Sequence, residues 1–130
     1  EDQPLPRPPS GDDAAPLDAA TIRAMIRARR MRERFFLQGL FADPAWDMLL
    51  DLMAARLEGQ QVAVSSLCIA AAVPPTTALR WIKALTEGGL FVRKADPEDR
   101  RRVYIELSDD AAMRFEAYLR AAQRVAPLTV

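Results

Sequence analysis

Apolar side chains recur every three or four residues along most of this chain, a spacing that predicts helices with one buried face. Five such segments are expected, at residues 18–39, 43–58, 66–72, 75–87 and 109–125. Capping residues, a proline and glycines support these limits. The residues expected to begin or end the helices are Asp18, Asp43-Pro44, Gly59, Ser65 or Ser66, Gly88, and Ser108 or Asp109.

The first expected helix carries two distinct lines of side chains. Its apolar side consists of Ile22, Met25, Ile26, Phe36, Leu37 and Leu40. A separate line consists of Arg23, Arg27, Arg30 and Arg34. A solvated surface is the favoured interpretation of these arginines, with DNA backbone or an acidic protein as alternatives. Arg29 and Glu33 lie inside the apolar side four residues apart, so we expect them to pair there or across a subunit interface.

After Gly88-Gly89 the pattern changes to alternation of apolar and polar residues, which predicts strands. Strands are expected at residues 90–94 and 102–107, joined by the turn Asp96-Pro97-Glu98-Asp99, with a further extended piece at 62–64. Helices followed by a hairpin predict a mainly α protein with a small β-wing. This is the order of a winged helix-turn-helix, in which the helix at 75–87 reads DNA.

The expected helix at 75–87 has two faces. Ala78, Trp81, Ile82 and Leu85 are expected to pack on the core, whereas Thr76, Leu79, Arg80 and Lys83 face outward. The outward face suits the major groove: Arg80 matches guanine bidentately, and Leu79 can contact a thymine methyl group. Thr76 and Thr77 can bond base edges or phosphates at the helix N-terminus.

The expected hairpin turn carries Arg100, Arg101 and Arg102 directly after Asp99. Arginines on a projecting hairpin are typical of minor-groove contacts, and Asp99 is expected to hold one of them by an ion pair. A merely solvated hairpin is the alternative. The complete set of predicted DNA-binding residues is Thr76, Thr77, Leu79, Arg80, Lys83, Arg93, Arg100, Arg101 and Arg102.

Charge is unevenly distributed although the net charge is zero. Residues 18–42 carry six arginines against two acids, and residues 76–105 carry seven basic residues against four acids. Residues 1–17 hold four acids, one arginine and five of the ten prolines, so we expect a disordered acidic tail. An inert extension is favoured over one that competes with phosphates for the basic face. Residues 18–130 then form the winged-helix domain with its flanking helices.

Nothing in the chain favours catalysis or metal binding. It has no histidine, the commonest general base and metal ligand, and a single cysteine provides no zinc pattern. Gly88-Gly89 follows a helix instead of opening one, so it is no phosphate-binding loop. We therefore expect no enzyme activity, no cofactor and no metal.

Cys68 lies in an apolar helical stretch, which favours a buried core thiol over a redox sensor. No apolar run approaches the roughly 18 residues of a membrane span. The N-terminus lacks the apolar stretch of a signal peptide, so the expected location is the cytoplasm.

The second half of the chain resembles the MarR family of bacterial winged-helix transcription regulators in the motifs that begin and end its helices and strands. The motifs are Val73-Pro74-Pro75-Thr76-Thr77, Gly89-Leu90, Asp96-Pro97-Glu98-Asp99-Arg100-Arg101, the strand from Val103 to Leu107, and Ser108-Asp109. The resemblance implies a homodimer joined through its N- and C-terminal helices and bound to a palindromic operator. It implies major-groove contacts for Thr76, Thr77 and Arg80, and a minor-groove contact for Arg100. Arg101 would pair with Asp99 or meet phosphate. Relatives often bind small aromatic ligands, but no residue here marks such a pocket, so any effector is left open.

Two other functions are compatible with the same fold. The domain could be a protein-interaction module that uses the arginines between Arg23 and Arg34. Alternatively, it could be an architectural DNA binder with little sequence preference. A sequence-specific regulator is favoured, because the outward face of the helix at 75–87 combines hydroxyl, apolar and cationic groups suited to base edges.

Overall fold

The computed structural model describes residues 17–126, so most of the expected acidic tail lies outside the described residues. Leu17, expected to belong to that tail, is buried in the core. The order of the elements is α1 (Ala19–Met31), the 3-10 turn η1 (Arg32–Arg34), α2 (Pro44–Glu58), β1 (Val62–Ala63), α3 (Val64–Ala70), α4 (Pro75–Glu87), β2 (Phe91–Ala95), β3 (Val103–Leu107) and α5 (Asp109–Val125).

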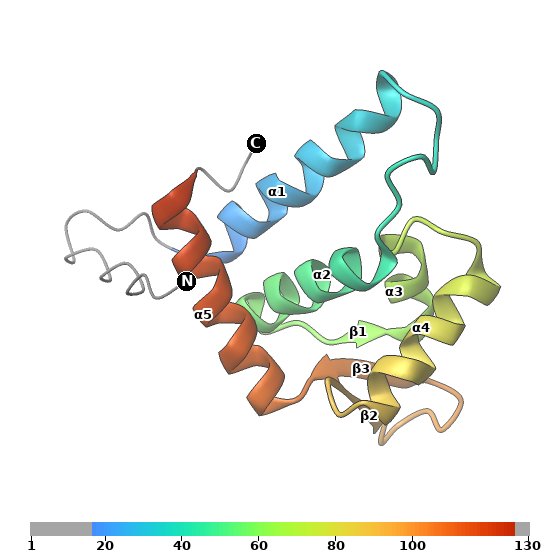
Figure 1. Ribbon diagram of the computed structural model, residues 1–130. Helices are drawn as coiled ribbons and strands as arrows, with labels where there is room; N and C mark the ends of the chain where they lie inside the picture. The colour runs from blue at the N-terminus through green and yellow to red at the C-terminus, as the bar shows by residue number, and fades with distance from the viewer. Residues whose placement is uncertain (1–16, 127–130) are drawn as a thin grey trace.

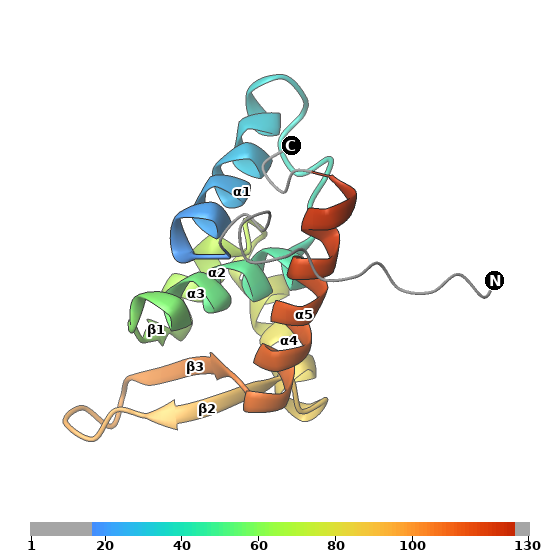
Figure 2. The same cartoon turned by 90° about the vertical axis from the view of Figure 1, so that its left-hand side faces the viewer.

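The small sheet is antiparallel and has the order β1-β3-β2. Val62 pairs with Ile105, and Phe91 pairs with Leu107 at the other side of β3. The short extended piece expected at 62–64 therefore contributes the edge strand of the sheet. Helices α2, α3 and α4 lie on one side of the sheet, and the β2–β3 hairpin reaches out beyond them (Figures 1 and 2).

The core lies between the helices and the inner face of the sheet. Its largest fully buried side chains are Ile22, Met48, Leu50, Met53, Leu67, Ile82, Phe91, Ile105, Leu107 and Leu119. Every one of the five helices supplies at least one of them, so burial of apolar surface joins the flanking helices to the winged helix. The described helices include none long and apolar enough to cross a membrane.

The helix boundaries agree with the sequence at several caps. Asp18 and Asp43 accept hydrogen bonds from the backbone N–H groups of Thr21 and Trp46, and Ser108 accepts one from Ala111. Gly59 ends α2 in the left-handed conformation, at φ 69°. These side chains satisfy N–H groups that have no partner within the helix.

The first helix is shorter than expected. It ends at Met31, followed by η1, and the chain then runs as an exposed loop to α2. Phe36, Leu37 and Leu40, which the helical spacing assigned to the buried side, are all exposed. Apolar spacing stabilises a helix only where a neighbouring surface covers it, and within one subunit none covers this segment. Figure 1 shows the end of α1 and its loop standing away from the winged helix.

Two other expectations are wrong in detail. Helix α3 begins at Val64 with no side-chain cap, and Ser65 and Ser66 lie exposed within it. Pairing of β1 with β3 fixes the chain directly before α3, so the helix starts without a capping serine. Trp81 was expected in the core, yet its side chain is 39% exposed. Ala78 and Ile82 occupy the inner face of α4, and the large indole remains at its edge.

Candidate nucleic-acid interface

The outward face of α4 lies as the sequence predicts. Thr76, Leu79, Arg80 and Lys83 are exposed, and Thr77 is half-buried. Ala78 and Ile82 are buried on the opposite face, which sets the rotation of the helix about its axis. Within the described residues, Arg80 and Lys83 form no ion pair, so both cations are available to an external anion.

The N-terminus of α4 is also open. Pro74 precedes the helix without a side-chain cap, and Pro75 is its first residue. Pro75 has no N–H group, so the first backbone donors of this helix are those of Thr76 and Thr77. Donors of this kind together with the helix dipole favour an anion such as phosphate.

Side-chain and backbone bonds order the turn of the wing. The N–H of Arg102 donates to the carbonyl of Asp99 at 2.9 Å, and the N–H of Asp96 donates to the carbonyl of Arg102 at 3.1 Å. The carboxylate of Asp99 accepts from the N–H of Arg101 at 3.0 Å. It also lies 3.5 Å from the Nε of Arg101, so the expected ion pair is present. Arg101 is nevertheless almost fully exposed.

Tyr104 braces the same turn from β3. Its hydroxyl donates to Asp96 at 3.2 Å and lies 3.5 Å from the guanidinium of Arg102. This contact, with the nearby carboxylates, raises the pKa of Arg102 above its ordinary value. Arg102, like any arginine, is positively charged at neutral pH. Arg100 is exposed and makes no ion pair in the described part of the chain.

A cleft of about 880 Å³ separates the wing from the helices α3 and α4. Leu79 from α4 and the residues Asp99, Arg101 and Arg102 from the wing line it. The structure thus brings Leu79, Arg101 and Arg102 to one concavity, although Leu79 lies more than twenty positions before the two arginines in the sequence. Six of the predicted residues are not part of its lining: Thr76, Thr77, Arg80, Lys83, Arg93 and Arg100. Arg93 lies on β2 opposite Ile105.

Cys68 also lines this cleft and is half-buried, in contrast to the fully buried core thiol that we expected. Its position near the end of α3 places it at the edge of the core. Partial burial raises the pKa of the Cys68 thiol. The thiol therefore remains protonated near neutral pH and is a poor nucleophile.

The line of arginines on α1 is not a simple solvated surface. Arg23 pairs with Asp51 at 2.7 Å and with Glu58 at 2.9 Å, both on α2. Arg30 pairs with Asp47 at 2.8 Å and with Glu33 at 3.1 Å. Two members of the line thus join α1 to α2, whereas Arg27 and Arg34 are exposed.

The expected pair of Arg29 with Glu33 does not form within the subunit, because Arg29 bonds to Asp47 and Glu33 pairs with Arg30. The alternative pair across a subunit interface stays a prediction. Asp47 is a residue that the sequence reading did not single out, and its side chain is only 3% exposed. Its helical phase is a signal that could have located it. It lies three residues before Leu50 and seven before Ala54, which are both fully buried on α2.

Comparison with known proteins agrees with this geometry. Residues 51–111 match the family model described as a winged helix DNA-binding domain. A solved complex of MepR from S. aureus with DNA is 18% identical over 79% of this chain and 79% of that chain, with a TM-score of 0.56. A MepR variant from a multidrug-resistant S. aureus clinical isolate is 21% identical over 71% of this chain and 62% of that chain, with a TM-score of 0.51. MarR is 20% identical over 82% of this chain and 71% of that chain, with a TM-score of 0.50. No curated protein sequence matches the chain.

The chain is therefore a winged-helix protein with the fold of the MarR-family regulators, and the resemblance found in the sequence is confirmed at the level of the fold. The matched model is that of a DNA-binding domain, and the solved neighbours share its winged-helix fold.

Proposed function

We propose that the chain acts as a homodimer on a palindromic DNA site, with α4 in the major groove and the wing turn in the minor groove of each half-site. The observation that carries this proposal is that α4 and the wing turn, the two elements that border one cleft, both carry exposed cations. A groove edge fits between them, because α4 and the wing then follow adjacent grooves of the same duplex. A dimer bound near a promoter occludes or repositions RNA polymerase without any chemistry of its own.

On α4, each exposed residue type has a matching partner on DNA. Arg80 has the planar fork that reads guanine bidentately, and Leu79 beside it suits a thymine methyl group. Thr76 and Thr77 bond phosphate or base edges from the first turn. Lys83, one turn beyond Leu79, reaches the phosphate backbone as a point charge.

The arginines of the wing have different proposed DNA contacts, according to the contacts that each makes within the protein. Arg100 is unpaired within the described residues and enters the minor groove, where narrow A·T-rich tracts concentrate negative potential. Arg101 exchanges its long contact with Asp99 for a phosphate. Arg102 and, further along β2, Arg93 contact the backbone, so they contribute affinity more than discrimination.

The dimer rests on apolar surface that one subunit leaves uncovered. The segment from Met31 to Phe41 exposes six large apolar side chains, and α5 exposes Met113, Tyr118 and Val125. A stable interface needs about 800 Å² from each partner, whereas an aromatic side chain buries roughly 150–250 Å². In a two-fold dimer, the loop of one subunit covers α5 of the other, and the reverse contact doubles the area.

Selection of bound duplexes from a randomised library tests this proposal. Purified protein is mixed with the library, and the most enriched duplex is then titrated at two salt concentrations. We expect a palindrome with half-sites about one helical turn apart, bound about 10³-fold or more tightly than random DNA. Sedimentation of the complex should give two subunits per duplex.

The other outcomes identify the alternatives. Binding without any enriched motif, with affinity that falls steeply as salt rises, indicates an architectural binder held by phosphates alone. Absence of DNA binding at low salt indicates a protein-interaction module. Either result contradicts the proposal.

A further inference from the structure

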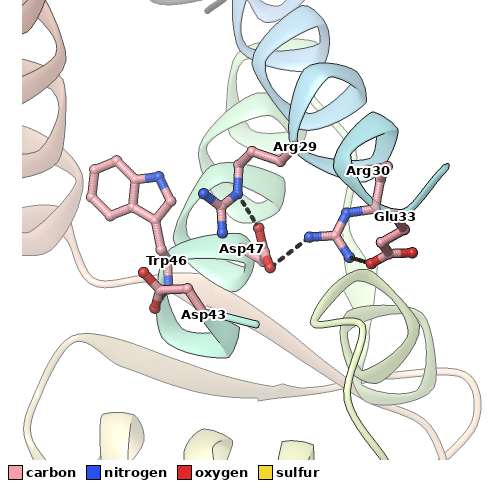
Figure 3. A network of polar contacts seen from close by, with 6 residues as sticks. All are labelled: Arg29, Arg30, Glu33, Asp43, Trp46 and Asp47. Atoms are coloured by element: carbon pink, nitrogen blue, oxygen red, sulfur yellow. Dashed lines mark hydrogen bonds and ion pairs between the residues drawn. The ribbon is translucent and has the colours of Figure 1, made fainter. Parts of the chain in front are cut away.

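Two separate groups of ion pairs hold α1 against α2. Near the start of α1, Arg23 bonds to Asp51 and, through two nitrogens, to Glu58. At the end of α1, Arg29 and Arg30 both bond to Asp47, at 2.5 and 2.8 Å. Figure 3 shows the two guanidinium groups converging on the two oxygens of the Asp47 carboxylate.

Apolar packing holds only the first part of α1. The buried residues of this helix are Ile22 and Met25, and Ile26 packs partly on the core. From Arg27 to Met31 no residue of α1 is buried. The ion pairs with Asp47 are therefore the main attachment of the last turn of α1 to the winged helix.

Burial distinguishes the Asp47 group from the Arg23 group. The difference lies in the carboxylates: the Asp47 side chain is 3% exposed, whereas those of Asp51 and Glu58 are 15% and 33% exposed. Among the arginines, Arg29 is 14% exposed, and Arg30 and Arg23 are each about one third exposed. A buried ion pair adds little net stability, because desolvation offsets its attraction, but removal of one member leaves a buried charge without a partner. Such a group holds one geometry in preference to others.

We infer that Asp47 is a positioning residue that sets the angle between α1 and the winged helix, and through it the half-site spacing that the dimer accepts. This inference rests on the proposed function, because the exposed segment that follows α1 is the proposed dimer surface. A rotation of α1 about its packed first turns moves that surface relative to α4. Successive base pairs are only 3.4 Å apart, so a small rotation changes the matching spacing.

Trp46, the residue before Asp47, connects α5 to the first turn of α2. Helix α5 carries the second apolar surface of the proposed dimer. Trp46 packs against Phe115 and Tyr118 of α5, with ring centroids 5.1 and 5.5 Å apart. The first turn of α2 thus contacts α1 through Asp47 and α5 through Trp46. The same α2 continues into the core beneath α4, so the dimer surfaces and the reading helix share one rigid element.

Asp47→Asn is the direct test, with Asp51→Asn as the matched control. Both variants neutralise one aspartate on α2 that bonds to an arginine of α1, but Arg23 keeps Glu58 when Asp51 is changed. The selected palindrome is prepared with its half-sites at the preferred spacing and one base pair closer or further apart. Binding to each duplex and to an isolated half-site is measured, with sedimentation as the check of dimer formation.

A wrong spacing must be absorbed by deformation of DNA, so the parent should prefer its own spacing by about tenfold or more. We expect Asp47→Asn to reduce that preference at least about threefold while half-site affinity and dimer formation are kept. Asp51→Asn should match the parent. An unchanged preference in Asp47→Asn overturns the inference, and so does an equal loss in both variants.

Arg30→Gln decides the question if Asp47→Asn does not fold, since Arg29 then remains on Asp47. It should lower the spacing preference in the same direction, and an unchanged preference contradicts the inference. A parent protein that selects no palindrome contradicts the proposed function instead, so the two failures are distinguishable.

Discussion

Trp46 packs edge-on against Phe115, with ring planes at 84° and centroids 5.1 Å apart. This contact joins α2 to α5, because Trp46 lies in the first turn of α2 and Phe115 is buried on the inner face of α5. Edge-to-face pairs of this kind are worth about 0.5–1.5 kcal/mol beyond the area that they bury.

A double-mutant cycle with Trp46→Leu and Phe115→Leu should therefore give a coupling energy of about 1 kcal/mol in urea unfolding. The control cycle combines Trp46→Leu with Tyr118→Leu. The ring of Tyr118 also packs against Trp46, but Tyr118 is more than half exposed. Its coupling should be smaller. Equal coupling in both cycles would mean that burial does not determine the strength of this contact.

Ala72→Gly should stabilise the protein. Ala72 has φ 58°, a left-handed conformation that a β-carbon disfavours, in the turn between α3 and α4. Glycine relieves the strain but loses more entropy on folding, so we expect a gain of about 0.5–1 kcal/mol in the free energy of unfolding. Ala84→Gly, at an exposed position inside α4, should lose a similar amount. Thermal unfolding of the two variants checks the opposite signs.

Arg80→Ala should reduce sequence discrimination. Loss of one bidentate contact to guanine costs about 1–3 kcal/mol at the correct site and little on random DNA. Competition binding between the selected palindrome and a scrambled duplex measures this ratio. Arg114→Ala removes an exposed cation from α5 that pairs with Asp110, and it should leave the ratio unchanged. A uniform loss of affinity in Arg80→Ala would assign the residue to phosphate.

Arg100→Ala should weaken binding mainly through the salt-dependent part of the affinity. One lost phosphate or minor-groove contact lowers the slope of log K against log salt by about one. Titrations at several salt concentrations give this slope, and Arg114→Ala again serves as the control. A slope equal to that of the parent would show that Arg100 does not contact DNA.

Acid should remove the stabilisation that Glu58 gives. The hydrogen bonds from Arg23 hold the pKa of Glu58 below its ordinary value of 4.5. A lowered pKa in the folded state adds stability above the ordinary pKa, and this stability is lost as the pH falls through the folded value. Arg23→Gln should therefore be less stable than the parent at neutral pH, and the difference should shrink as the pH falls below the ordinary pKa of 4.5. Urea unfolding across this range measures it. A difference independent of pH would exclude the Glu58 contribution.

Local chemistry determined the order of the elements. Aspartate and serine caps, the glycine at the end of α2 and the alternation in β3 act within a few residues, so the sequence alone predicted most boundaries of α2, α4, β2, β3 and α5. The outward face of α4 followed from helical phase, because a helix on a core must bury its most apolar side. The nine predicted DNA-binding residues depend on these same local rules, and they remain predictions.

Tertiary structure decided what depends on neighbours distant in the sequence. The end of α1 at Met31 and the exposure of Phe36, Leu37 and Leu40 follow from the absence of a covering surface within one subunit. The partners of Arg23, Arg29 and Arg30 lie on another helix, so spacing along α1 could not identify them. Helical periodicity specifies which side chains share a face. Only packing against other elements decides which of those faces is buried and which charged side chains pair across the contact.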